Sequence, residues 1–227
     1  MAEVMTGDRR PIASRERPVF QRLAARLARA GTSANAISIF GMLAGISAGA
    51  LLVATRFTDG IATHVCFLLA AGGIQLRLLA NMLDGMVAIA SGKASQVGEL
   101  YNEIPDRISD TAILVGAGYA AGGDPTLGWA AASVALFVTY IRAVGKTVGV
   151  PGLFQGPMSK SHRMFTLTVA SVCLGLLPEA WQPMWTSPGF NSPVGIMAAT
   201  LALVIVGGIL TAWRRLRRIV RAMRERP

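Results

Sequence analysis

Apolar runs and short polar segments alternate along most of this chain. Each run approaches the roughly 20 residues that a helix needs to cross a bilayer. We therefore expect an all-α integral membrane protein with about six transmembrane helices, although the same pattern also allows five or seven. In the first run Gly41, Gly45 and Gly49 recur at four-residue spacing, which favours close packing of helix backbones. The predicted spans are residues 35–55, 63–88, 99–121, 127–145, 164–182 and 194–213.

The N-terminal segment follows a different pattern. In RERPVFQRLAARLARAG, arginine alternates with Leu, Phe and Val at helical spacing. This pattern is typical of an amphipathic helix on an anionic membrane surface, and a soluble extension or a docking helix is the alternative. The segment has no early apolar core, so we expect no signal peptide. Three regions follow: a basic N-terminal segment at 1–30, a transmembrane domain at 31–213 and a basic cytoplasmic tail at 214–227.

The charge distribution indicates membrane topology. The 227 residues are 52% hydrophobic and carry a formal net charge of +10. Seven arginines precede residue 30, and seven more lie in the final segment RRLRRIVRAMRERP. Because basic residues flank membrane helices on the cytoplasmic side, both termini are expected in the cytoplasm and the number of crossings is expected to be even. We expect the protein in a bacterial inner (plasma) membrane, with no nucleic-acid partner.

The cysteines and histidines do not have the spacing of a metal site. Cys66 and Cys173 lie alone in apolar sequence, and His64 and His162 are equally isolated. We expect both cysteines to be small buried side chains without a disulfide.

The polar stretch NMLDGMVAIASGKASQVGELYNEIPDRISD, residues 81–110, interrupts the apolar pattern. In the predicted topology it ends one inward-running helix, turns in the cytoplasm and begins the next helix. At about 100° per residue, the polar positions of each helix fall on one face. The first face carries Arg77, Asn81, Asp84 and Ala88, and the second carries Glu99, Asn102, Glu103, Asp106 and Asp110. Because the two helices are antiparallel neighbours, we expect the two faces to meet across a cavity.

This acidic cavity requires positive charge. A carboxylate at membrane depth costs at least ~2.5 kcal/mol, and several on one face also repel each other. Carboxylate and amide oxygens, without Cys or His, favour Mg²⁺ or Mn²⁺. Arg77 and Arg107 are further sources of positive charge. In the alternative interpretation, these polar residues only cap helices and pair with arginines at the water interface.

A second polar constellation lies on the same predicted side. It consists of Arg142, Lys146, Lys160, His162 and Arg163. Cations near an anionic substrate favour a pocket for a phosphorylated acceptor or for a lipid phosphate. The alternative is that these residues only follow the positive-inside rule.

The motif DGMVAI, followed by eight residues and GELYNEIPD, resembles the signature of the CDP-alcohol phosphotransferase family. That signature reads D-x-x-D-G-x-x-A-R, about eight residues, then G-x-x-x-D-x-x-x-D. Upstream, TSANAISIFG resembles the family element P-N-x-x-T/S through Asn35 and Ser38. Downstream, GPMSKSHRM resembles the basic loop before the fifth helix. The resemblance covers roughly residues 30–165, and the family fold has six helices.

The resemblance implies a membrane-embedded phosphatidyltransferase of phospholipid biosynthesis. It implies transfer from CDP-diacylglycerol to an alcohol acceptor, phosphorylated or not, with release of CMP and with Mg²⁺ or Mn²⁺ bound. A soluble CDP-alcohol donor with a diacylglycerol acceptor is the alternative, and a homodimer is usual in the family. Asp106 matches the catalytic base, and the implied metal ligands are Asn81, Asp84, Asn102 and Asp106. The implied nucleotide-binding residues are Asn35, Ser38, Gly85, Ala88, Lys93 and Gly98. The implied acceptor- or phosphate-binding residues are Arg142, Lys160 and Arg163.

Three positions depart from the family signature. Asn81 and Asn102 replace two of its four aspartates, and Ile89 replaces its arginine. We expect weaker metal binding and the loss of one of two metal positions. Glu99, Glu103 and Asp110 are candidates to compensate for the lost carboxylates, and Lys93 and Arg77 for the lost arginine. These departures leave two other functions open: an impaired family member that binds nucleotide or lipid, or a small transporter.

Overall fold

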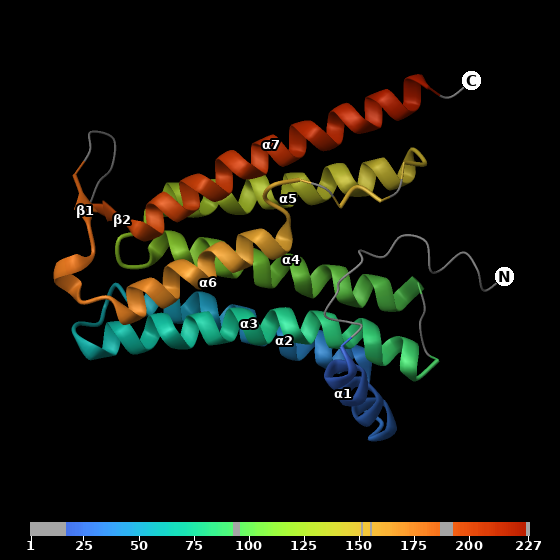
Figure 1. The fold of residues 1–227 in the computed structure, drawn as a ribbon, viewed down its shortest axis with the longest axis horizontal. Coiled ribbons are helices and arrows are strands. Elements are labelled where there is room, and N and C mark those ends of the chain that lie inside the picture. Colours follow the sequence, from blue (N-terminus) through green and yellow to red (C-terminus); the bar gives the residue numbers. More distant parts are fainter. Residues whose placement is uncertain (1–16, 93–95, 151, 155, 187–192, 226–227) are drawn as a thin grey trace.

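A computed structural model describes residues 17–92, 96–150, 152–154, 156–186 and 193–225 (Figure 1). Lys93 and the segments 1–16 and 226–227 lie outside this part of the chain. The α-helices are α1 (Pro18–Arg29), α2 (Ala34–Ala54), α3 (Ile61–Ala90), α4 (Gln96–Tyr119), α5 (Pro125–Thr147), α6 (Lys160–Leu176) and α7 (Ile196–Arg224). A short 3-10 helix (Glu179–Trp181) precedes β1 (Met184–Trp185), which pairs antiparallel with β2 (Val194–Gly195).

The long helices α2 to α7 lie side by side as a bundle, and α1 crosses one end of it (Figure 1). Of these, α2, α3, α5 and α7 are long and apolar enough to cross a membrane. Helix α4 carries the acidic stretch, and α6 has 17 residues. The all-α membrane fold is therefore confirmed, while six crossings remain a prediction.

Helix α6 and the C-terminal region differ from the predicted spans. Helix α6 occupies Lys160–Leu176 and was expected at 164–182. It ends early because Pro178 disfavours helical geometry at Leu177, whose backbone is extended at φ −75° and ψ 135°. Helix α7 continues to Arg224, so the basic residues after 213 extend this helix instead of forming a separate segment.

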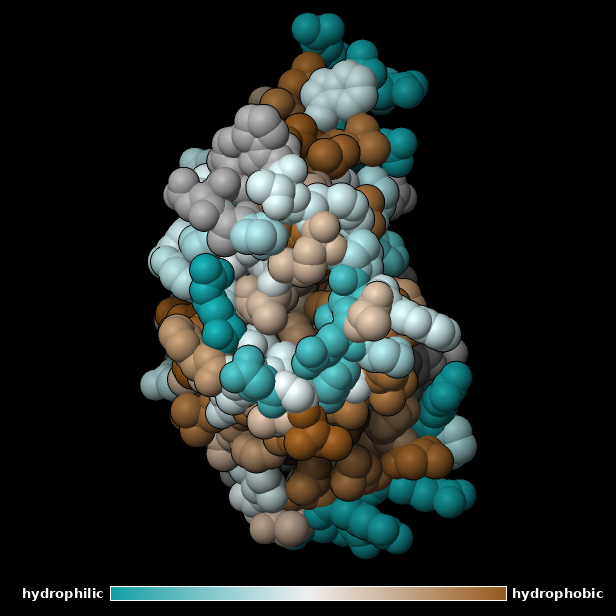
Figure 2. Space-filling view, turned by 90° about the vertical axis from the view of Figure 1, so that its left-hand side faces the viewer, coloured by the Kyte–Doolittle hydropathy of each residue, from teal (hydrophilic) through white to brown (hydrophobic). Residues whose placement is uncertain are grey.

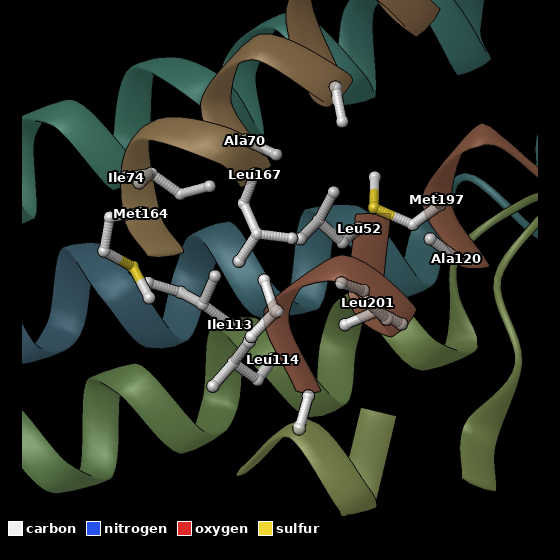
Figure 3. Packing of buried hydrophobic residues seen from close by; sticks show 14 of the residues in the cluster. Leu52, Ala70, Ile74, Ile113, Leu114, Ala120, Met164, Leu167, Met197 and Leu201 are labelled. Carbon is white, nitrogen blue, oxygen red and sulfur yellow. The ribbon is translucent and has the colours of Figure 1, made fainter. Parts of the chain in front are cut away.

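Six helices, α2 to α7, contribute to the hydrophobic core. Leu52, Ile74, Ile113, Leu167 and Leu201, one from each of α2, α3, α4, α6 and α7, are fully buried and point toward one another (Figure 3). Lipid tails are as apolar as leucine, so this core is stabilised by dense packing between helices more than by exclusion of water.

The glycine row of α2 brings its backbone against α3 and α4, which confirms the packing prediction. A Cβ atom at Gly41 would lie 2.8 Å from the Cβ of Ala80 on α3. At Gly49 it would lie only 2.4 Å from the carbonyl oxygen of Ala112 on α4. No side chain fits at these positions without displacing a neighbouring helix. The row therefore fixes how α2 presents its other residues to α3 and α4.

Helix α1 is amphipathic and packs against the end of α3. Its Ala24 is buried in a cluster with Ala80, Leu83 and Val87 of α3. The arginines of its opposite face are exposed: Arg17, Arg22, Arg26 and Arg29. The predicted amphipathic helix is therefore confirmed, and its place on a membrane surface remains a proposal.

Candidate functional site

The two predicted polar faces meet in one pocket. It lies at the end of the bundle that also holds α1 and the end of α7 (Figure 1). Asp84 of α3 and Asp106 of α4 both line this pocket, which confirms that the two faces meet. The complete lining is Ser38, Gly41, Met42, Arg77, Asn81, Asp84, Asn102, Pro105, Asp106 and Ser109.

Asp84 is buried, with 2% of its surface exposed, and three neighbours hold its carboxylate. Oδ2 accepts a hydrogen bond of 2.7 Å from the Ser38 hydroxyl of α2. Oδ1 accepts from the backbone N–H of Gly85 at 2.5 Å and from Asn102 Nδ2 at 3.4 Å. Ser38 reaches this position because the glycine row brings α2 close to α3.

The two asparagines form a direct link between α3 and α4. Asn81 Nδ2 donates a hydrogen bond of 2.7 Å to Asn102 Oδ1. Asn81 Oδ1 in turn accepts a hydrogen bond of 2.7 Å from Lys160 Nζ. Two carboxylates at this separation would repel each other, whereas an amide donates and accepts in the same contact. The amides therefore close the space between the helices without adding negative charge.

Asp106 is held by cations from two directions. Arg77 Nη2 donates to its Oδ1 at 3.0 Å, and Lys160 forms an ion pair and a hydrogen bond with its Oδ2. Arg107 Nη2 lies 3.6 Å from the same Oδ2. These charge-assisted contacts fix the orientation of the carboxylate.

Arg77 is deeply buried, with 1% of its surface exposed. It also contacts Asp110 Oδ1 at 2.5 Å and donates from Nε to the Ser109 hydroxyl at 2.9 Å. Gly45 leaves room for it, because a Cβ there would lie 3.3 Å from Arg77 Cγ. Nη1 of Arg77 has no hydrogen-bond partner among the described residues, and it belongs to a side chain that lines the pocket. The two N–H groups of Nη1 thus remain available for an anionic ligand.

Sequence reasoning named Arg77 as a counter-charge and as a candidate to replace the lost arginine, and it missed Ser109. The signal was present, because Ser109 lies three residues after Asp106 and so on the same helix face. Asp110, a candidate to compensate for lost ligands, is instead paired with Arg77 and lies 3.5 Å from Arg163 Nη2.

The structure divides the basic constellation into two groups. Lys160 joins the pocket, and buried Arg163 donates to the Met158 carbonyl at 3.1 Å beside Asp110. Arg142 pairs with Glu103 at 2.5 Å and lies over the ring of Phe154. Lys146 and His162 are exposed, away from the pocket lining. Lys160, Arg163 and Arg142 thus remain the candidate cations for a substrate phosphate.

The remaining candidate residues lie on nearby backbone. Asn35 is exposed in the first turn of α2. Gly85 and Ala88 are half-buried in the last turns of α3, and Gly98 belongs to the first turn of α4. Ile89, which stands where the family has arginine, is 60% exposed and makes no polar contribution.

The oxygen donors of the pocket fit a divalent cation only in part. Carboxylate and amide oxygens are the ligands that Mg²⁺ and Mn²⁺ prefer, and two of each converge here. The negative charge at these four positions comes from Asp84 and Asp106 alone, and Arg77 and Lys160 already pair with Asp106. Among the described residues, no cluster of three or more His, Cys, Asp or Glu side chains is arranged to hold a metal. The donor set therefore fits a single cation.

A second pocket lies at the opposite end of the bundle. Figure 2 views this end, where hydrophilic and hydrophobic residues lie side by side. It has a volume of about 380 Å³ and mixed charge, with Arg56, Asp59 and Glu179 in its lining. Fully buried Leu52 and Ile74 lie in the core between the two pockets. A transporter needs a polar path from both sides, so this core argues against that function.

No protein-family model matches the chain, but sequence relatives are clear. A phosphatidylinositol phosphate synthase of Streptomyces avermitilis is 29% identical over 208 residues, which cover 89% of this chain and 77% of that protein. An archaetidylinositol phosphate synthase of Aeropyrum pernix is 30% identical over 130 residues, 57% of this chain and 63% of the relative. One from Methanothermobacter thermautotrophicus is 26% identical over 204 residues, 88% and 94% of the two chains.

The resemblance to the CDP-alcohol phosphotransferase family is confirmed. The fold agrees as well. The Mycobacterium tuberculosis phosphatidylinositol phosphate synthase PgsA1, solved with CDP-DAG bound, superimposes with a TM-score of 0.68 at 18% identity, covering 89% of this chain and 94% of that one. Its form with manganese and citrate gives 0.67 at 19% identity, with 88% of each chain covered. Together with the apolar helices, these relatives show that the chain is an integral membrane protein of this fold.

Proposed function

We propose that this protein is a CDP-alcohol phosphatidyltransferase of phospholipid biosynthesis. It transfers a phosphatidyl group from CDP-diacylglycerol to an alcohol acceptor and releases CMP. The observation that carries the proposal is the convergence of Asp84 and Asp106, from two spaced halves of one motif, on a single buried pocket. The sequence relatives and the CDP-DAG bound to the solved neighbour support the same reaction.

In this reaction the acceptor hydroxyl attacks the β-phosphorus of the donor. A new P–O bond forms to the acceptor, the bond to the bridging oxygen breaks, and CMP leaves with that oxygen. Asp106 is the base that accepts the hydroxyl proton, and Arg77 holds the carboxylate that faces the pocket. Asp84 and Asp106, with Asn81 and Asn102, would hold Mg²⁺ or Mn²⁺, which would neutralise charge on the pyrophosphate.

The nucleotide would lie along the ends of α2, α3 and α4. Gly85, Ala88 and Gly98 present little side chain there, so a pyrophosphate can approach the backbone closely. Ser38 keeps Asp84 oriented toward the pocket, and Asn35 precedes it by one helical turn. Lys93, which lies between α3 and α4 in the sequence, completes the proposed nucleotide-binding set.

The proposed acceptor is a phosphorylated polyol, inositol phosphate in particular. Lys160, Arg163 and Arg142 lie around the acidic pocket, and Nε of buried Arg163 has no hydrogen-bond partner among the described residues. Such cations suit a phosphate on the acceptor. The names of the sequence relatives, synthases of inositol phosphate lipids from both bacteria and archaea, favour the same acceptor.

We also propose the cellular setting. The pocket, α1 and the basic end of α7 share one end of the bundle, which the positive-inside rule assigns to the cytoplasm of a bacterial inner membrane (Figure 1). Helix α1 lies in the interface with its arginines toward lipid headgroups. The protein is proposed to cross the membrane six times and to work as a homodimer.

A CMP-release assay tests this function. Purified protein is supplied with CDP-diacylglycerol, Mg²⁺ or Mn²⁺, and inositol phosphate, glycerol phosphate or serine. We expect CMP with inositol phosphate, and a loss of about 10²–10⁴-fold for Asp106→Asn because the base is removed. Asp59→Asn, in the loop at the opposite end, is the matched control and keeps full activity. Failure to release CMP with any acceptor contradicts the proposal.

A second function is favoured by the two amides. A protein with Asn81 and Asn102 in place of carboxylates suits a binding role for nucleotide or lipid without turnover. It would bind CDP-diacylglycerol with micromolar or better affinity in the same preparation that releases no CMP. The CMP-release assay and a binding isotherm on one sample separate the two functions.

A further inference from the structure

Lys160 reaches into the acidic pocket from a third helix. It is the first residue of α6, and its ammonium group contacts both Asn81 Oδ1 of α3, at 2.7 Å, and Asp106 Oδ2 of α4. It thus links a motif position of α3 to a motif position of α4. A small cation that binds oxygen ligands between two helices does the same.

Four residues stand at the positions of the family's aspartates: Asn81, Asp84, Asn102 and Asp106. Every side-chain oxygen of these residues already accepts a hydrogen bond. Those of Asp84 accept from Ser38, Gly85 and Asn102. Those of Asp106 accept from Arg77 and Lys160. The amide oxygen of Asn81 accepts from Lys160, and that of Asn102 from Asn81. The protein's cations are concentrated at Asp106, whereas the donors to Asp84 are neutral. The pocket therefore has a half neutralised by protein cations and a half that is not.

The two halves differ in what they offer to a divalent cation. Beside Asp84, the donors are a hydroxyl, an amide and a backbone N–H, all of which leave its charge in place. Beside Asp106, an ammonium and a guanidinium group repel a metal ion, and the repulsion doubles for a divalent charge. A carboxylate at position 81 would offset this repulsion, but an amide does not.

We propose that the ammonium group of Lys160 takes the place of one divalent cation in this site, so that the protein binds a single divalent ion on the Asp84 side. The proposal rests on the proposed function for its role in the reaction. An ammonium group has three N–H donors, and two of them contact Asn81 and Asp106. The third is directed to a phosphate oxygen of the substrate, where Lys160 supplies charge that a second metal would supply.

Mn²⁺ binding without substrate tests the proposal. Electron paramagnetic resonance counts bound Mn²⁺ on the purified full chain in detergent. We expect one Mn²⁺ per wild-type chain and one per Asn81→Asp/Asn102→Asp chain, because Lys160 still excludes the second ion. Adding Lys160→Met to that double variant raises the count to two. Lys160→Met alone binds its one Mn²⁺ about tenfold more tightly, since a neighbouring positive charge is removed.

Two controls isolate the charge of Lys160. Lys160→Arg keeps the charge, and its Mn²⁺ affinity stays within threefold of wild type. Lys146→Met makes the same chemical change at an exposed lysine outside the pocket lining, and binding is unchanged. Gel filtration selects monodisperse, folded samples. Should Lys160→Met not fold, the count for Asn81→Asp/Asn102→Asp still decides, because two ions there refute exclusion by Lys160.

Several results overturn the proposal: two Mn²⁺ or none on the wild-type chain, or a Lys160→Met affinity within twofold of wild type. The outcome is independent of catalysis, because no nucleotide is present. A chain that binds one Mn²⁺ but releases no CMP refutes the proposed function and leaves the role of Lys160 intact. A chain that releases CMP with two bound Mn²⁺ supports the proposed function and refutes the role of Lys160.

Discussion

The same three helices, α2, α3 and α4, are held together in different ways in the two halves of the bundle. Near the core, Gly49 of α2 and Gly116 of α4 face each other, and a Cβ at Gly116 would lie 2.4 Å from the Gly49 carbonyl oxygen. Near the pocket, Arg77 of α3 pairs with Asp106 and Asp110 of α4. In the first half the helix backbones touch without side chains between them. In the second half charged side chains lie between the helices.

The difference shows how a membrane bundle makes room for a polar site. Close backbone contact leaves no space for a ligand, but it fixes the helices at one end. Paired charges at the other end keep the helices apart while their mutual attraction limits the cost of burial. The pocket therefore depends on both halves, and substitutions can weaken each half separately.

The largest effect is expected at Arg77. Arg77→Leu leaves Asp106 and Asp110 without their common buried cation, which should destabilise the protein by about 3–5 kcal/mol. Unfolding of the detergent-solubilised protein by denaturant or heat measures the change. Arg56→Leu, at an exposed arginine of the opposite end, is the control and has little effect. A stable Arg77→Leu variant would show that the charged half does not hold the helices.

A smaller effect is expected from the glycine row. Gly49→Ala places a methyl group 2.4 Å from the Ala112 carbonyl oxygen, and the forced separation of α2 from α4 should cost about 1–3 kcal/mol. Gly72 of α3 is the matched control, because a Cβ there meets nothing within 4 Å. Gly72→Ala should instead stabilise the helix by about 0.5–1 kcal/mol. Equal melting temperatures for the two variants would contradict the packing argument.

The smallest effect is expected at Ser38, at the pocket end of α2. Ser38→Ala removes one of the hydrogen bonds to Asp84, while those from Gly85 and Asn102 remain. We expect about a tenfold loss of Mn²⁺ affinity and of CMP release, with little change in melting temperature. Ser47→Ala, at an exposed serine of the same helix, measures the background. A tenfold loss in that control would point to α2 as a whole and not to the hydrogen bond.

Sequence patterns predicted the parts of this structure that depend on local periodicity. The lengths of the apolar runs predicted the helices. The helical angle of about 100° per residue predicted the two polar faces, and Asp84 and Asp106 on these faces line one pocket. The family signature identified which of the polar residues belong together. These features are properties of one or two neighbouring helices, so a single sequence contains them.

Contacts between distant helices were harder to predict. Lys160 lies 54 residues from Asp106 in the sequence, and its reach depends on how α6, which begins at Lys160, packs against α3. Helical periodicity placed Arg77 on the polar face of its helix. It did not predict that Arg77 forms ion pairs with both Asp106 and Asp110. Whether α4 and α6 cross the membrane likewise cannot be decided from hydropathy, because their charges are satisfied only inside the bundle.

The pairing of charges across α3, α4 and α6 has a consequence for biogenesis. In the proposed six-crossing topology, helix α4 enters the bilayer with Asp106 and Asp110 and α6 enters with Arg163, so neither helix partitions favourably alone. Arg77 of the preceding α3 forms an ion pair with Asp110 of α4. Asp110 then also pairs with Arg163 of α6. The nascent chain is thereby expected to leave the translocon as coupled helices, each delivering the counter-ion that the next one needs.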